Sequence, residues 1–125
     1  MRTVEWHNGV VRMIDQRQIP WQLVQVDLSD YKSVASAIQN MTVRGAPAIG
    51  AAAGFGLAIA AKQSPATTLD TLMDDLQTAA ETLKLARPTA VNLAWAVDKL
   101  MTMATSGEFQ HPDDLREMLL SEAQA

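Results

Sequence analysis

The sequence predicts an α+β fold, in which a small three-stranded antiparallel meander is followed by a bundle of about five helices. Two observations predict it. Runs rich in β-branched and aromatic residues lie within the first 26 positions, and apolar residues recur at helical spacing from about residue 31 onward. A chain of 125 residues has the length of one domain, so we expect residues 1–125 to fold as a single unit.

Three segments account for the predicted meander. Thr3–His7 and Val10–Ile14 flank Asn8-Gly9, and this dipeptide favours a type I′ hairpin turn, in which both central residues have positive φ. Asp15–Pro20 is polar and ends in proline, which indicates a loop. The run WQLVQV at Trp21–Val26 is the third predicted strand.

The helices follow in order. Ser29 and Asp30 are suitable N-cap residues for the first one, whose apolar residues run from Tyr31 to Met41. The others are expected at Ala46–Lys62, from Leu69 to Leu83, from Val91 to Met101, and from Pro112 to the end. The last one reaches Ala125 without a glycine or proline stop, which favours a chain that continues in a longer protein.

Composition excludes several classes of function. The chain has no cysteine, so it has no disulfide or thiol nucleophile, and its net charge of −4 with scattered basic residues argues against a nucleic-acid partner. His7 and His111 have no ligand-like neighbours, so we expect no metal site. The 17 residues between Arg44 and Lys62 are rich in Gly and Ala and short for a membrane span. We therefore expect a cytoplasmic protein.

Two predicted helix starts, each preceded by an arginine, contain the residues best suited to bind a ligand. VRGAP places Arg44 and Gly45 before one predicted helix, and ARPTA places Arg87 before another. The free N–H groups of a helix's first turn attract anions, and an adjacent arginine adds a planar cation that binds phosphate. If the two junctions meet, they form a phosphate-sized pocket. The alternative, that both arginines are solvated or paired with carboxylates, stays open at this point.

The glycines of the second predicted helix do not form a nucleotide-binding motif. Gly54-Phe55-Gly56 lacks the third glycine of a dinucleotide fingerprint and does not follow a strand of a βαβ unit. The Gly/Ala run instead predicts a thin helix against which the other helices pack closely.

These segments also carry a family resemblance. VRGAPAIGAAAGFGLA (Val43–Ala58), ARPTAVNLAWAVDKL (Ala86–Leu100) and VRMIDQRQIP (Val11–Pro20) resemble the N-terminal domain of the methylthioribose-1-phosphate isomerase family. The wider superfamily includes ribose-1,5-bisphosphate isomerase and the regulatory subunits of the translation-initiation guanine-nucleotide exchange factor.

The resemblance implies that an aldose phosphate is converted to a ketose phosphate in methionine salvage, without a cofactor. It implies that Arg44, Gly45, Ala46 and Arg87 contact the sugar phosphate. The family's catalytic cysteine and aspartate belong to a Rossmann-like C-terminal domain that this chain lacks. No catalytic residue is therefore assigned here, and we expect the isolated chain to be inactive.

Two expectations about partners accompany that assignment. The surface that would face the C-terminal domain should leave apolar area exposed, so we expect self-association, as a dimer, through the Gly/Ala helix or the last helix. The alternative function is a non-catalytic interaction or regulatory module, like the exchange-factor subunits.

Overall fold

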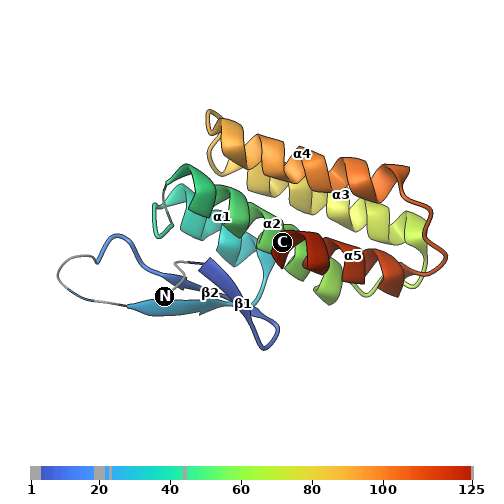
Figure 1. The fold of residues 1–125 in the computed structure, drawn as a ribbon, viewed down its shortest axis with the longest axis horizontal. Helices are drawn as coiled ribbons and strands as arrows, with labels where there is room; N and C mark the ends of the chain where they lie inside the picture. Colours follow the sequence, from blue (N-terminus) through green and yellow to red (C-terminus); the bar gives the residue numbers. More distant parts are fainter. Residues whose placement is uncertain (1–3, 19–21, 23, 44, 125) are drawn as a thin grey trace.

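The computed structural model of the chain describes residues 4–18, 22, 24–43 and 45–124, and it confirms the α+β class (Figure 1). Three strands come first, followed by five helices. The strands are β1 (Val4–His7), β2 (Val10–Ile14) and β3 (Gln25–Leu28). The helices are α1 (Tyr31–Gln39), α2 (Ala46–Gln63), α3 (Leu69–Leu85), α4 (Val91–Ser106) and α5 (Pro112–Gln124).

The sheet is an antiparallel meander with the strand order β1-β2-β3. Asn8 and Gly9 both have positive φ, 50° and 85°, and His7 lies opposite Val10. This confirms the predicted hairpin at Asn8-Gly9, because the type I′ geometry requires positive φ at both central residues.

The predicted third strand, Trp21–Val26, was placed too early. Gln22 and Val24 are not in a strand, and Trp21 and Leu23 lie outside the described residues. Pairing with β2 sets the true position at Gln25–Leu28, since Val26 lies opposite Met13 and Leu28 opposite Val11. The bidentate pair between Arg12 and Asp27, with Nε 2.8 Å from Oδ1, fixes the same register from the polar face. Asp27, one residue beyond the predicted strand, therefore lies inside β3.

Helix α2 is the centre of the fold, and α1, α3, α4, α5, β1 and β2 all pack against it (Figure 1). Its residues from Ala52 to Ala61 are buried. A Cβ atom added at Gly56 would lie 3.0 Å from Leu83 Cδ2 and 3.1 Å from Val34 Cγ1, so α1 and α3 approach the helix backbone there. This confirms the prediction of a thin, buried Gly/Ala helix.

Helix α5 is tied to the C-terminal end of α2 by one side chain. Arg116 donates through Nε to the carbonyl oxygen of Ala61 at 2.7 Å, and through Nη2 to the carbonyl oxygens of Ser64 and Ala66 at 3.0 and 2.9 Å. These carbonyls lie at or beyond the end of α2, where backbone acceptors lack helical partners. The contact spans about 50 residues of sequence and explains why the end of the chain lies beside α2 (Figure 1).

Candidate functional site

The N-termini of α1, α2, α3 and α4 differ in whether a side chain caps their free N–H groups. Asp30 caps α1, accepting from Ser33 N at 2.7 Å, and Thr68 caps α3, accepting from Thr71 N at 3.2 Å. Helices α2 and α4 start instead after Gly45 and Ala90, and neither residue has a side chain that could cap the helix. The first-turn donors of α2 and α4 are therefore left for other partners.

The N-termini of α2 and α4 open onto the same hollow, which we call the Gly45–Arg87 hollow. It has a volume of about 700 Å³, within the usual range for small-molecule sites. Its lining residues come from the loop after β2, the turn after α1, and the starts of α2 and α4. They are Gln16, Met41, Gly45, Ile49, Arg87, Ala90, Val91 and Asn92.

The structure places two of the four predicted ligand-binding residues in this hollow. Gly45 and Arg87 line the hollow together, although they are separated by 41 residues of sequence. Ala46 is the first residue of α2, and Arg44 lies outside the described residues. Gly45 has φ 93° and ψ 134°, a conformation that strains any residue with a Cβ atom, so glycine is required where the chain turns into α2.

The polar side chains of the hollow are not used by the fold. Within the described part of the chain, those of Gln16, Arg87 and Asn92 form no hydrogen bond with another residue. Arg87 contributes a permanent cation, and the two helix starts add oriented N–H groups. This combination suits a small anion with further hydroxyl groups.

A hydrogen-bonded turn holds two of the lining residues in place. Gln16 N donates to Thr42 O at 2.8 Å, and Thr42 donates through N and Oγ1 to Asn40 Oδ1 at 3.0 and 2.6 Å. Met41, between Asn40 and Thr42, has φ 69°, which is uncommon for a residue other than glycine. The loop that carries Gln16 is thereby connected to the turn that carries Met41.

The same loop is fixed by a buried carboxylate. Asp15 is 3% exposed, and both of its oxygens accept from Arg17, at 3.0 Å from Nε and 2.8 Å from Nη2. Hydrogen bonding from the Arg17 side chain holds the pKa of the Asp15 carboxyl below its ordinary value. The ion pair is structural, because both carboxylate oxygens are occupied by Arg17.

Sequence reasoning missed Gln16, Met41 and Asn92. Asn92 stands inside the quoted ARPTAVNL segment but has no distinguishing neighbour, and Gln16 and Met41 come from a loop and a turn. No local pattern marks these residues, since only the packing of α1, α4 and the meander against α2 brings them to the hollow.

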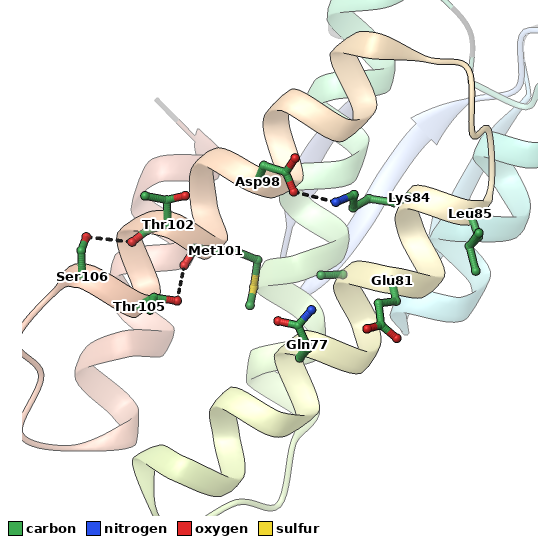
Figure 2. Close-up of a pocket in the computed structure, with 10 residues that line it drawn as sticks. Gln77, Glu81, Lys84, Leu85, Asp98, Met101, Thr102, Thr105 and Ser106 are labelled. Carbon is green, nitrogen blue, oxygen red and sulfur yellow. Dashed lines mark hydrogen bonds and ion pairs between the residues drawn. The ribbon is translucent and has the colours of Figure 1, made fainter.

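A second hollow, the α3–α4 groove, lies between those two helices and has a volume of about 630 Å³ (Figure 2). The side chains of Lys84, Asp98, Thr105 and Ser106 are paired within the protein, whereas those of Gln77, Glu81 and Thr102 form no hydrogen bond with another described residue. Lys84 Nζ lies 2.8 Å from Asp98 Oδ1, while Thr105 and Ser106 donate to Met101 O and Thr102 O of their own helix. Asp98 is exposed.

Among the residues that the structure describes, no cluster of three or more His, Asp or Glu side chains could hold a metal ion. Over the same residues, none of the helices has both the length and the apolar character that crossing a membrane would require.

Two solved structures have a fold similar to that of this chain. The 5-methylthioribose 1-phosphate isomerase from Pyrococcus horikoshii OT3 superposes with a TM-score of 0.94 at 46% identity, covering 98% of this chain and 34% of that one. The delta subunit of translation initiation factor eIF-2B from A. fulgidus gives a TM-score of 0.90 at 35% identity, covering 98% and 35%.

Sequence comparison identifies the family of the chain. Residues 42–125 match the Initiation factor 2 subunit family, and the chain belongs to that family. The methylthioribose-1-phosphate isomerase of Desulforamulus reducens is 41% identical over 125 residues, which are all of this chain and 36% of that protein. The chain thus spans about a third of the length of the curated relatives it matches.

Proposed function

We propose that this chain forms the sugar-phosphate-binding part of an isomerase that acts on methylthioribose-1-phosphate in methionine salvage. One observation carries the proposal: the two uncapped helix N-termini and the Arg87 guanidinium line a single hollow. The names of the similar isomerases from P. horikoshii and D. reducens support this choice of ligand.

In this proposal, each group has a separate role toward the sugar phosphate. Arg87 neutralises the phosphate charge, and the first-turn N–H groups of α2 and α4 donate to its oxygens. Gly45 lets the backbone approach the ligand, Ala46 contributes a first-turn N–H, and Arg44 adds a second guanidinium. In this proposal Gln16 and Asn92, which line the same hollow, bond the sugar hydroxyls.

The chemistry itself is proposed to need groups beyond this chain. Conversion of this aldose phosphate to a ketose phosphate moves a hydrogen from C2 to C1 and breaks the bond between C1 and the ring oxygen. The ring oxygen takes up the proton that the C2 hydroxyl loses as it becomes a carbonyl. No residue here is assigned to that transfer. We expect the 125-residue chain to bind the substrate without turning it over, and sustained isomerase activity of the pure chain would contradict this.

Titration of the ¹⁵N-labelled chain with methylthioribose-1-phosphate tests the binding role directly. We expect saturable shifts of the amide signals of Gly45, Ala46, Ala48, Ile49 and Ala90–Asn92, and none at Thr105 and Ser106 in the α3–α4 groove. Unchanged spectra, or shifts confined to the groove, would refute the proposed function.

The second candidate is a non-catalytic interaction module, and the likeness to the eIF-2B delta subunit favours it. Trp95 supports it physically, since this large apolar residue is 64% exposed on α4. The proposed contacts are a second copy or the remaining two thirds of the longer relatives. Association measured by sedimentation, together with no response to the sugar phosphate, would favour this function over the first.

A further inference from the structure

We propose that a hollow at the C-terminal end of α2 binds a free α-amino acid with an apolar side chain. The hollow has a volume of about 510 Å³ and is lined by residues of β1, the end of α2, the loop after it, and α5. We call it the Lys62–Glu117 hollow, after two of its charged residues. About 24 Å of helix separates Lys62 from the start of α2, so this site is distinct from the Gly45–Arg87 hollow and independent of the proposed function.

Several polar side chains of this hollow are already used by the fold. Arg116 donates to three carbonyl oxygens around the end of α2 and, through Nη1, to Asp113 Oδ1 at 2.8 Å. The hydroxyl of Ser64 donates to a carboxylate oxygen of Asp75 on α3. Arg116, Asp113 and Ser64 therefore hold the walls of the hollow together, and the charges left for a ligand are those of Lys62 and Glu117.

Lys62 provides a cation that other residues hold in place. Its Nζ donates to Gly9 O at 3.1 Å and lies 5.7 Å from the centroid of the Trp6 ring, which itself stacks on Phe55. A Cβ atom added at Gly9 would lie 2.1 Å from this Nζ, so the ammonium lies directly against the hairpin turn. An ammonium has three N–H donors, and two of them remain for the carboxylate of a ligand.

Glu117 provides the opposite charge. It is exposed on α5, and its carboxylate forms no hydrogen bond or ion pair with another described residue. Lys62 and Glu117 line the same hollow, yet they form no ion pair with each other. Two opposite charges in one hollow that do not meet leave room for a ligand that carries both, as an α-amino acid does.

The remaining lining residues are apolar. Ala58 is buried, whereas Trp6 and Leu120 are half-buried, and Pro65 and Ala66 complete the set. This surface suits an aliphatic side chain, whose transfer out of water adds to the binding free energy. The ligand carboxylate then binds Lys62, its ammonium binds Glu117, and its side chain contacts Trp6 and Leu120.

Titration of the ¹⁵N-labelled chain with L-leucine tests the proposal. We expect saturable shifts of the Trp6 indole N–H and of the Lys62 and Glu117 amides, none at Ala90–Asn92, and a Kd of about 1 mM. Leucinamide lacks the carboxylate and N-acetyl-leucine lacks the ammonium. Each should bind about 3- to 10-fold more weakly, because charge pairs with exposed partners contribute modestly. A peptide end carries only one of the two charges, so these compounds also distinguish a free amino acid from a peptide terminus.

Two variants assign each ligand charge to its residue. Lys62→Met keeps an unbranched side chain without the charge, and it should remove the difference in affinity between leucine and leucinamide. Glu117→Gln should remove the difference between leucine and N-acetyl-leucine. Glu81→Gln is the matched control, because Glu81 is an exposed carboxylate of the α3–α4 groove, and it should keep both differences. Far-UV circular dichroism verifies that each variant is folded.

Binding of leucine with both differences, each removed by its own variant, would support the amino-acid site. The proposal is wrong if the signals of Trp6, Lys62 and Glu117 do not shift, or if all three compounds bind equally. It is also wrong if both differences survive in the two variants. Should a variant fail to fold, the three compounds still decide on the unsubstituted chain. None of these outcomes involves the sugar phosphate, so the proposed function is tested separately.

Discussion

The Gly45–Arg87 hollow and the α3–α4 groove are similar in volume but differ in how their polar groups are used. In the groove, Lys84 is paired with Asp98, and the hydroxyls of Thr105 and Ser106 return to their own helix. In the hollow, the side chains of Arg87 and Asn92 form no hydrogen bond with another described residue, and two helices start without a capping side chain. The cation of the groove therefore already has an anionic partner, whereas the cation and the helix starts of the hollow are available to an anionic ligand.

Replacing the cationic residue of each hollow with alanine should give the largest difference in affinity for the sugar phosphate. Arg87→Ala should weaken binding of methylthioribose-1-phosphate by about 1.5–3 kcal/mol, the usual value of a hydrogen bond to a charged group. Lys84→Ala should leave the affinity unchanged, because Lys84 already has a carboxylate partner. Isothermal titration of both variants measures this, and equal losses would remove the distinction between the two hollows.

Backbone conformation at the rim offers a second test. Gly45→Val should lower the free energy of unfolding by about 1–3 kcal/mol, because a side chain at φ 93° is strained even though nothing lies within 4 Å of its Cβ position. Gly50→Ala is the control, since its Cβ would make only ordinary contacts at 3.8 and 3.9 Å and alanine favours a helix. Urea unfolding of both variants decides, and an unaffected Gly45→Val would show that the turn relaxes freely.

Low pH should weaken the ion pair between Asp15 and Arg17, which fixes the loop that carries Gln16. The pKa of Asp15 is lowered in the folded chain, so its contribution to stability is complete above the unfolded value of about 3.9 and is lost as the pH falls through the lower folded value. Asp15→Asn should cost about 1–2 kcal/mol at pH 7 and progressively less below pH 4. Denaturant unfolding of both proteins across this pH range measures the difference, and a constant difference would exclude the linkage.

The smallest effect is expected in the groove. Lys84 and Asp98 are 40% and 61% exposed, so their ion pair should contribute only about 0.2–0.5 kcal/mol and less in high salt. A double-mutant cycle with Lys84→Ala and Asp98→Ala measures it. A coupling above about 1 kcal/mol would mean that the groove is more ordered than its exposure indicates.

Local chemistry explains which parts of the fold were predictable. The hairpin follows from Asn8-Gly9, the start of α1 from Asp30, and the ends of α3 and α4 from Pro88 and Gly107. The start of β3 was not predictable, because WQLVQV has as good a strand pattern as QVDL. Only the pairing of Val26 with Met13 selects the second.

The residues of the candidate site that could be predicted are likewise those with a local signal in the sequence. Arg87 and Gly45 were identified because each stands beside a helix start, a signal that is local in sequence. Gln16 and Met41 were missed because they reach the hollow through the contact between Gln16 N and Thr42 O, which joins segments that are distant in sequence. The sequence thus reveals the groups that bind an anion, and tertiary structure reveals those that surround it.

Arg116 has a consequence for the electrostatics of α2. A helix has a positive and a negative end, and the carbonyl groups at its negative end here receive a guanidinium from α5, while the positive end opens to the hollow. A cation that meets the negative end of the helix removes the part of its field that would repel an approaching anion. This effect is local, since the field of a helix end falls off within about one turn and is screened by salt, so removing the charge of Arg116 should weaken the docking of α5 on the end of α2 and leave anion binding at the hollow unchanged.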